Sequence, residues 1–451
     1  MKIAIVHDFL MQMGGAEKVV EVLHEMYPDA PIYTSLYDPK AMPPQYRDWD
    51  IRTSFMQKLV GQKTHRAALL LYPMAFESFD FSDYDVVISS SSAFAKGIIT
   101  QPRTAHICYK HAPMRYAWMT DTYMNKEKTG RFARSLLVPG IHYLRMWDLL
   151  SASRVDHYVA NSSVVARRIR KFYGRDCDLV YPPVDISRFD IAPEVGDYCI
   201  IVSRFAPYKR IDLAVEAFTR MKKPLKVIGA GRQMKELQAK AGSCVEFLGR
   251  LSDKETSRLM AGARAYIMPG EEDFGIAPVE ANACGRPVIA YAAGGALDTQ
   301  IDGETGVLFH QQTVDSLCEA VQRMEQISWN PQRIRANAQR FATEVFREQM
   351  AKLINEYSNQ TVRTENAPHR NGVSQSRAEN GAHVSHAVHL KSVGMNQATA
   401  PDSIDHSFHN GDSDRSFSED RDDEFGDAVL AGQSYSYQDE DSKSAPEEMA
   451  R

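Results

Sequence analysis

The chain of 451 residues is 43% apolar and 25% charged, so it can bury the cores of two ordinary domains, and uniform disorder is excluded. Residues 359–451 differ from the rest, because they hold only sixteen large apolar side chains and 8 Lys and Arg against 17 Asp and Glu. A segment of this composition buries too little apolar surface to fold, which predicts a disordered, acidic, low-complexity tail over 359–451. The remaining 45 basic and 41 acidic residues are nearly balanced, so the net charge of the body favours no class of partner.

Cysteine usage and hydropathy indicate the compartment. The six cysteines show neither CxxC nor zinc-ligand spacing, and several fall in apolar runs, which predicts reduced thiols in the core. The opening residues MKIAIVHDF hold too short an apolar run for a signal peptide, and no segment approaches the roughly eighteen consecutive apolar residues of a membrane span. The sequence therefore predicts a cytoplasmic protein that does not cross a membrane.

The first part of the chain is predicted to alternate strands and helices. Residues 2–7 have the pattern of a short buried strand, a loop ending in Gly14-Gly15 follows, and residues 16–23 have helical spacing. Three further strands are predicted at 85–88, 105–109 and 158–162. Pro182-Pro183 then indicate a stiff linker, so a first Rossmann-like domain is predicted over 1–182.

The second part alternates more regularly, and a capping box from Ser252 to Glu255 begins one of its helices. Six strands are predicted, at 198–203, 225–229, 244–248, 265–269, 287–291 and 306–309. This alternation predicts a parallel sheet covered on both faces, in a second Rossmann-like domain over 183–340. Residues 313–326 and 331–358 are predicted to be helical, with 341–358 packing back toward the first domain. Because ligands of such sheets bind beyond the carboxyl ends of the strands, we expect the site in the cleft between the two domains.

Two glutamates in the segment 268–290 are the strongest indication of function. Glu272 lies in a loop of carboxylates after a predicted strand, and seven residues separate it from Glu280, which lies about one turn into the next predicted helix. That helix opens at Phe274-Gly275-Ile276, and the free N–H groups of a helix N-terminus suit an anionic or oxygen-rich ligand. A solvated acidic turn is the alternative interpretation of the carboxylates.

This segment resembles the E-x7-E signature, E-x-F-G-x-x-x-x-E-A-x-A-x-G-x-P-V, of retaining glycosyltransferases of family 4. The resemblance implies the GT-B fold, an α/β architecture of two Rossmann-like domains with parallel sheets facing across a cleft, and it implies retention of configuration at the sugar. It further implies that Glu272 holds hydroxyls of the donor sugar and that Glu280 accepts hydrogen bonds from the ribose of a nucleoside diphosphate sugar. Phe274, Gly275 and Ile276 would form part of the same substrate site.

A strand, a basic loop and a helix are predicted over 201–214. Arg204 and Lys209 stand five positions apart at the carboxyl end of this strand, where a guanidinium fork and an ammonium can clamp a diphosphate. In the family the corresponding Arg and Lys contact the diphosphate of the donor, so the resemblance implies these roles for Arg204 and Lys209. Arg210 stands where the family usually has Gly, which leaves open whether Lys209 or Arg210 does this work. A surface basic turn is the alternative.

Two features of the first domain extend the resemblance. Gly14-Gly15 resemble the glycine loop of the family, where the missing side chains let the backbone approach the sugar phosphate and the acceptor. Residues 108–118 resemble the H-x-P-x-R-Y-x-W segment of a subgroup that contains bacterial surface-polysaccharide mannosyltransferases. In related enzymes a histidine here lies against the donor sugar, so His111 joins Glu272, Lys209 and Arg204 as a candidate catalytic residue. A structural histidine is the alternative.

No metal site is predicted. Asp83-Tyr84-Asp85 is formally a DxD motif, but it introduces a strand, where packing or solvation accounts for both carboxylates. A basic clamp and helix N–H groups can replace a cation in stabilising the departing diphosphate. We therefore expect neither a metal nor another cofactor.

Two segments, 52–75 and 126–147, combine basic and apolar residues in the way of a surface that binds anionic lipid. Their apolar residues, which include Tyr72 and Trp147, are core residues in the alternative interpretation. Nucleic acid is not an expected partner, because no recognised module or concentrated basic motif is present.

The motifs and the resemblance together predict a retaining glycosyltransferase at the cytoplasmic face of the inner membrane. The resemblance implies GDP-mannose as the donor, and as the acceptor a lipid-linked saccharide on polyprenyl diphosphate in exopolysaccharide or O-antigen assembly. One alternative is a sugar-nucleotide epimerase of the same fold, which has no acceptor. Another is a non-catalytic saccharide-binding or assembly scaffold that recruits partners through its acidic tail.

Overall fold

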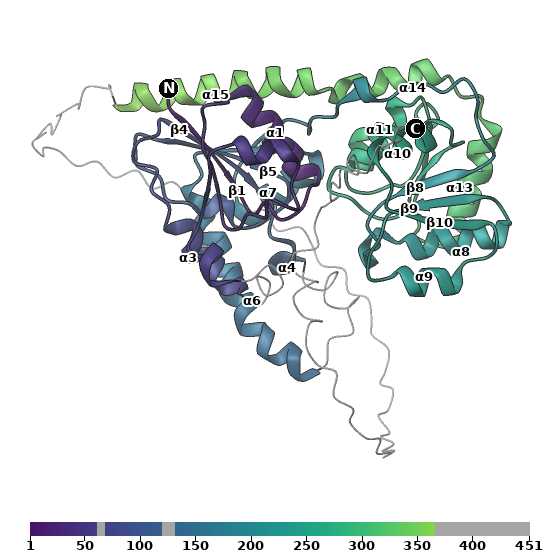
Figure 1. The fold of residues 1–451 in the computed structure, drawn as a ribbon, viewed down its shortest axis with the longest axis horizontal. Coiled ribbons are helices and arrows are strands. Elements are labelled where there is room, and N and C mark those ends of the chain that lie inside the picture. The colour runs from purple at the N-terminus through teal and green to yellow at the C-terminus, as the bar shows by residue number, and fades with distance from the viewer. Residues whose placement is uncertain (61–67, 120–130, 366–451) are drawn as a thin grey trace, which may run out of the picture. The chain divides into compact units, whose positions relative to one another are not determined.

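The computed structural model describes residues 1–60, 68–119 and 131–365 of the chain. Both of its sheets are wholly parallel and have helices packed against them (Figure 1). Both faces of the second sheet are buried, since Cys199 and Ile201 belong to one apolar cluster while Ile200 and Val202 belong to another. The predicted α/β class with two Rossmann-like domains is confirmed.

The first sheet has seven strands in the order β3-β2-β1-β4-β5-β6-β7. Its strands are β1 (Ile3–His7), β2 (Ile32–Thr34), β3 (Ile51–Thr53), β4 (Val86–Ser91), β5 (Ala105–Lys110), β6 (His157–Ala160) and β7 (Asp178–Leu179). The four strands predicted for this part are present. The prediction missed β2, β3 and β7, because strands of two or three residues are too short to show a periodic pattern.

The second sheet has six strands in the order β10-β9-β8-β11-β12-β13. Its strands are β8 (Cys199–Val202), β9 (Leu225–Ile228), β10 (Val245–Gly249), β11 (Tyr266–Met268), β12 (Val288–Tyr291) and β13 (Gly306–Phe309). All six were predicted. Their near-continuous apolar runs are typical of strands that are buried on both faces.

Helices follow most of the strands. Those in the first part of the chain are α1 (Gly15–Met26), α2 (Met56–Leu59), α3 (Tyr72–Glu77), α4 (Arg115–Trp118), α6 (Arg131–Ser151) and α7 (Ser163–Tyr173). Those in the second part are α8 (Ile211–Met221), α9 (Met234–Lys240), α10 (Asp253–Ala261), α11 (Ile276–Ala283), α12 (Ala296–Thr299), α13 (Val314–Gln326), α14 (Pro331–Ala338) and α15 (Thr343–Glu365). The predicted capping box of Ser252 and Glu255 is present at the start of α10.

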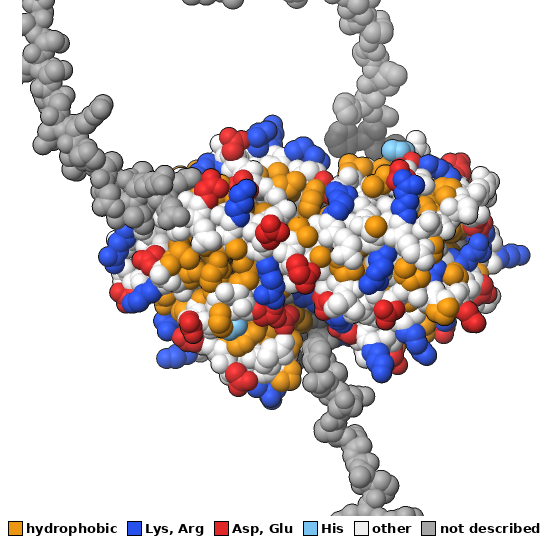
Figure 2. Space-filling model, turned by 90° about the horizontal axis from the view of Figure 1, so that it is seen from above, with side chains coloured by type: hydrophobic (Ala, Val, Ile, Leu, Met, Phe, Trp, Pro, Cys, Tyr) orange, Lys and Arg blue, Asp and Glu red, His pale blue; other side chains and the backbone are white. Residues whose placement is uncertain are grey.

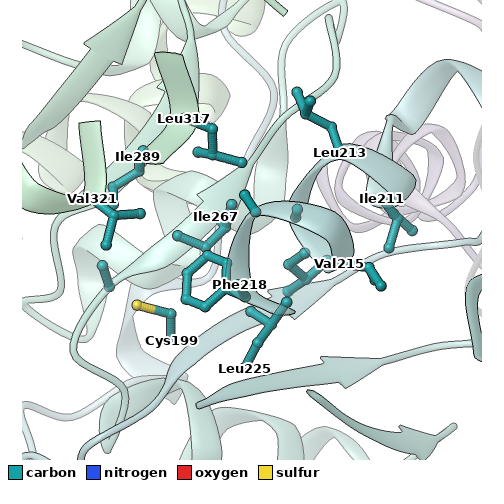
Figure 3. Close-up of a cluster of buried hydrophobic side chains, with 14 of the residues drawn as sticks. Cys199, Ile211, Leu213, Val215, Phe218, Leu225, Ile267, Ile289, Leu317 and Val321 are labelled. Carbon is teal, nitrogen blue, oxygen red and sulfur yellow. The ribbon is translucent and has the colours of Figure 1, made fainter. Parts of the chain in front are cut away.

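The core of the second domain is a cluster of aliphatic and aromatic side chains from the sheet and from α8 and α13 (Figure 3). Phe218 of α8 lies among Cys199, Leu225 and Ile267, which belong to three neighbouring strands. All six cysteines are unpaired, and four of them are buried. On the face of the molecule shown in Figure 2, acidic and basic side chains alternate, so no single charge dominates there.

Helix α15 follows the second domain in sequence but contributes to the core of the first. Phe346, Met350 and Ile354 are four residues apart and therefore lie on one face of the helix, and they are buried in the cluster that contains Ile5 and Tyr109. This packing fixes the helix, and once a helix is fixed, further turns extend it without a new nucleation step. α15 accordingly continues to Glu365, beyond the predicted start of the tail at 359.

The rest of the predicted tail, residues 366–451, lies outside the described residues, as do 61–67 and 126–130 of the two predicted lipid-binding segments. Among the helices that the structure describes, none combines the length and apolarity that a bilayer crossing requires.

Candidate active site

The predicted site residues follow the carboxyl ends of strands beside two switch points. In the first sheet β1 lies between β2 and β4, and in the second β8 lies between β9 and β11, and these are the positions where open parallel sheets bind ligands. Gly14 and Gly15 follow β1, Arg204 and Lys209 follow β8, and Glu272 follows β11, while His111 follows β5, one strand further from β1 than β4.

The basic loop after β8 is held by its own side chains. Arg204 donates a hydrogen bond from Nη2 to the Tyr208 hydroxyl at 3.0 Å, and Lys209 Nζ is bonded directly to Glu272 Oε1. Arg210 adopts the left-handed conformation, with φ of 52° and ψ of 37°, and its Nε lies 3.1 Å from Asp212 Oδ1. A left-handed position favours Gly, which adopts it without the steric cost that a Cβ atom adds.

The carboxylates of the acidic loop after β11 are all paired with cations. Asp273 is 7% exposed and accepts hydrogen bonds from Arg115 and Arg168, and Glu271 Oε1 lies 2.8 Å from Arg168 Nη2. Glu272 is bonded to Lys209. Each carboxylate in the loop therefore has a cationic partner, which the alternative of a solvated acidic turn does not provide.

The contact between Lys209 and Glu272 joins the basic loop after β8 to the acidic loop after β11. Both side chains are mostly buried, so little solvent screens their attraction. Burial also means that each charge is costly without a partner. The Lys209 ammonium has three N–H donors, so an anionic ligand can bind it beside Glu272 or in place of Glu272, and a carboxylate released in this way can accept hydrogen bonds from hydroxyl groups.

A pocket of about 150 Å³ contains several of the predicted residues. Gly14, Gly15, Arg204, Ile276 and Glu280 all line it. A side-chain carbon built on Gly15 would lie 2.7 Å from Ile276 Cδ1, so the start of α1 approaches the start of α11 closely. His111, Lys209, Glu272, Phe274 and Gly275 do not belong to the pocket wall.

Three cations in this pocket were not predicted: Lys18, Arg188 and Arg250. Burial raises the pKa of Glu280, while the nearby charges of Lys18 and Arg188 oppose that shift. Arg188 is itself hydrogen-bonded to Asp253 on the pocket wall. Of these three cations, only Lys18 could have been expected from the sequence, because it lies one turn after Gly14-Gly15.

The opening of α11 presents backbone rather than side chains. The Phe274 side chain is buried against Tyr181 and Phe341, so it is a core residue. Gly275, with φ of 87°, is the N-cap of α11, and no side chain caps the helix there. The first N–H groups of α11 can therefore bind a ligand, as the sequence led us to expect for a helix N-terminus.

Three residues of the H-x-P-x-R-Y-x-W segment have specific partners. His111 is 1% exposed and lies with Nε2 2.7 Å from Ser90 Oγ, and burial holds its pKa well below the usual range, so the ring is neutral. Arg115 is bonded to Asp273, and the indole Nε1 of Trp118 donates to Asp148 Oδ2 at 2.6 Å. The segment is thus fixed at three points.

Two family models match the chain. The model described as Glycosyltransferase Family 4 matches residues 13–188, and the model described as Glycosyl transferases group 1 matches residues 185–341. The first match contains β2 to β7, and the second contains all of the second sheet.

Curated relatives match over shorter stretches. An uncharacterised glycosyltransferase of Methanocaldococcus jannaschii is 32% identical over 133 residues, which is 28% of this chain and 38% of the relative. The GDP-mannose-dependent alpha-(1-6)-phosphatidylinositol monomannoside mannosyltransferase of Mycolicibacterium smegmatis is 30% identical over 170 residues, which is 31% of this chain and 44% of that enzyme. The match spans less than half the length of either relative.

Solved structures show the same fold over most of the chain. The Anabaena protein HepE in complex with UDP has a TM-score of 0.59 and 18% identity, covering 79% of this chain and 100% of HepE. Sucrose-phosphate synthase of Thermosynechococcus elongatus has a TM-score of 0.63 and 18% identity, covering 80% of this chain and 100% of the synthase. The two family models together cover residues 13–341, and they relate both domains of the chain to glycosyltransferases of the GT-B fold.

Proposed function

We propose that the protein is a retaining glycosyltransferase that moves mannose from GDP-mannose to a lipid-linked saccharide on polyprenyl diphosphate, in exopolysaccharide or O-antigen assembly. The observation that carries the proposal is the direct contact between Lys209 and Glu272. Lys209 lies in the same loop as Arg204, which lines the pocket. Transfer of a glycosyl group is supported by the family models, which match both domains. The donor is supported by the mycobacterial relative, which is named as a GDP-mannose-dependent enzyme.

Four of the candidate residues have specific roles in this proposal. The diphosphate of the donor binds Arg204 and Lys209, whose charges stabilise the negative charge that grows on the leaving group. Glu280 accepts hydrogen bonds from the ribose hydroxyls, and Glu272 accepts them from the sugar. Because Lys209 and Glu272 are paired in the structure, donor binding exchanges one partner for another at both side chains.

Metal independence is part of the proposal. The cations of the basic loop and the N–H groups of α11 supply the positive potential that a metal ion would otherwise give to the diphosphate. Within residues 1–60, 68–119 and 131–365, no three His, Cys, Asp or Glu side chains are grouped as metal ligands would be. Activity that survives a chelator would support this part, and strict dependence on a divalent cation would overturn it.

A lipid-linked acceptor requires the enzyme to work at the cytoplasmic face of the inner membrane. In this proposal the exposed face of α6 contacts that membrane. Trp147 and Tyr72, two apolar residues of the predicted lipid-binding segments, are buried in the core and therefore unavailable to lipid. Exposed apolar side chains lie instead on the outer face of α6, on the helical turn before α3 and on α3: Val138, Tyr143, Met146, Leu149, Leu150, Leu70 and Met74. Leu70 lies next to α6 at Gly140, so the turn before α3 borders α6 there.

A screen of purified protein with nucleoside diphosphates tests the donor. We expect GDP to raise the melting temperature more than UDP or ADP, because ligand binding to the folded state stabilises it. Incubation with GDP-mannose and a polyprenyl diphosphate saccharide should then give a lengthened saccharide. Epimerised donor without transfer would favour the epimerase alternative, and binding without any turnover would favour the scaffold.

Glu272→Gln and Glu280→Gln are expected to separate the roles of the two carboxylates. Glu272→Gln should lower kcat roughly 10- to 100-fold, because a hydrogen bond to a charged group contributes about 1.5–3 kcal/mol, while the affinity for GDP is kept or improved as Lys209 is freed. Glu280→Gln should weaken GDP binding itself, since a ribose contact is equal in ground and transition states. Calorimetric titration with GDP and steady-state kinetics measure both effects, and an equal loss of GDP affinity in the two variants would contradict the assignment.

Leu149→Ser combined with Leu150→Ser is expected to weaken binding to anionic vesicles about tenfold. These side chains are 40% and 63% exposed, and moving two half-exposed leucines into lipid contributes roughly 1–2 kcal/mol. Cosedimentation with vesicles that contain phosphatidylglycerol measures the effect. Val195→Ser, which removes an equally exposed apolar residue from the second domain, is the matched control. Equal binding by all three proteins would exclude the α6 surface as the contact.

A further inference from the structure

A chain of buried polar side chains connects His111 to α1. His111 Nε2 lies 2.7 Å from Ser90 Oγ, and Ser90 Oγ lies 3.1 Å from His7 Nδ1. On its other side, His7 Nε2 lies 3.5 Å from Glu17 Oε1. Glu17, His7, Ser90 and His111 are each at most 2% exposed, so the chain is closed to solvent along its length.

The fold brings these four residues together from distant parts of the sequence. His7 is the last residue of β1, and it is the direct register partner of Ser90 in the neighbouring strand β4. His111 follows β5, which pairs with the other edge of β4. Glu17 lies in the first turn of α1, three residues after Gly14 on the pocket wall.

One contact sets the direction of the hydrogen bonds. His7 Nδ1 also lies 3.1 Å from the backbone oxygen of Ser90, and a carbonyl oxygen can only accept, so Nδ1 carries a proton. The Ser90 hydroxyl then faces an N–H on the His7 side, and its own proton is free for His111 Nε2. No other hydrogen-bond acceptor for Ser90 Oγ is present in the described part of the chain.

The opposite arrangement would be costly. If His111 carried its proton on Nε2, the Ser90 hydroxyl would accept from both rings and its own proton would be buried without an acceptor. The contact between His7 and Glu17 does not change the direction of these hydrogen bonds. One proton lies between His7 Nε2 and the Glu17 carboxyl group whether the pair is ionised or neutral, and His7 Nδ1 keeps its own proton in both cases. Burial keeps His111 neutral by lowering its pKa, so the single ring proton belongs on Nδ1.

We propose that Glu17, His7 and Ser90 are positioning residues that fix His111 as its Nδ1–H tautomer, so that the ring donates a hydrogen bond to an oxygen of the donor sugar. No described residue is hydrogen-bonded to His111 Nδ1, which leaves that N–H for a ligand. The use of this N–H on a sugar rests on the proposed function, whereas the tautomer follows from the contacts and the burial of the ring.

The tautomer can be measured directly by ¹⁵N NMR of the full chain labelled on its histidine rings, with the His111 signals assigned by loss in His111→Gln. In the free protein and with GDP bound, we expect Nδ1 to give the shift of a protonated nitrogen and Nε2 that of an unprotonated one. Ser90→Ala removes the donor to Nε2 and should move the population toward Nε2–H. Ser90→Thr keeps the hydroxyl and should retain the wild-type shifts.

His7→Asn is the second variant, because the Asn amide offers an N–H close to the position of Nδ1, and it should also retain the tautomer if the threonine is too large for the site. With GDP-mannose, Ser90→Ala should lower kcat about tenfold without changing the affinity for GDP, as expected for the loss of one positioning hydrogen bond. An Nε2–H signal in the wild type, or unchanged His111 shifts in Ser90→Ala, would overturn the inference even if transfer is confirmed. If no transfer is found, the NMR result still decides the tautomer separately.

Discussion

Replacing Lys209 by Ala is expected to lower kcat/KM for the donor roughly 30- to 1000-fold. The ammonium lies at the carboxyl end of β8, in contact with Glu272 and largely shielded from water. In the proposed mechanism its charge acts on the diphosphate both when bound and when leaving, and one such contact in a preorganised site contributes about 2–4 kcal/mol. We therefore expect a higher KM and a lower kcat, measured by steady-state kinetics with GDP-mannose.

Arg210→Ala is the comparison variant for Lys209→Ala, because it removes a neighbouring cation that is paired with Asp212. The Arg210 side chain is paired with Asp212 and has no contact with the diphosphate in this proposal, so its loss should change kcat/KM less than about fivefold. A large loss in Arg210→Ala and none in Lys209→Ala would transfer the role to Arg210. If neither variant is impaired, this loop does not clamp a diphosphate.

The strands of the second domain could be predicted from sequence because burial on both faces leaves a local pattern. Runs such as Cys199 to Val202 are apolar throughout, and each is bounded by turn-forming or polar residues. β2, β3 and β7 have two or three residues each, and they form because neighbouring strands of the sheet offer them backbone partners. Pairing with strands that are distant in sequence is a tertiary effect, so it leaves no pattern in a short stretch of sequence.

The candidate site shows the same difference between local and tertiary information. The types of residue that follow each strand were visible in the sequence, but their partners were not. Lys209 and Glu272 are 63 positions apart, and Arg168 and Asp273 are 105 positions apart, so only the two sheets and their loops bring them together. Arg168 lies on an amphipathic helix, α7, where the sequence indicates only a polar face. Likewise, Leu149 and Leu150 lie beyond the predicted segment 126–147, and only the orientation of α6 shows that they are exposed.

Replacing Lys96 by Met is expected to lower the free energy of unfolding by about 3–5 kcal/mol. Lys96 lies in a short helical turn after β4, and its Nζ lies 3.1 Å from Asp148 Oδ1 with both side chains 0% exposed. It also donates to the Asp148 backbone oxygen and to Ser151 Oγ, each at 2.6 Å. Met fills most of the volume of the lysine, but it leaves the Asp148 carboxylate buried without its counter-ion, which is the costly outcome for such pairs. Urea denaturation monitored by circular dichroism measures the change in the free energy of unfolding.

The double variant Lys96→Met with Asp148→Asn isolates the charge from the packing. Asp148 Oδ2 also accepts from Trp118 at 2.6 Å and from the Tyr173 hydroxyl at 2.8 Å, and the carbonyl oxygen of Asn keeps an acceptor for both. With no charge left unpaired, most of the lost stability should return, because a neutral buried network with satisfied hydrogen bonds is cheaper than a lone ion. Arg170→Met breaks the pair with Asp176, whose side chains are 77% and 89% exposed, and should cost less than about 1 kcal/mol. A loss of similar size in Lys96→Met and Arg170→Met would mean that burial does not raise the cost of the unpaired Asp148, and a double variant no more stable than Lys96→Met would assign the loss to packing.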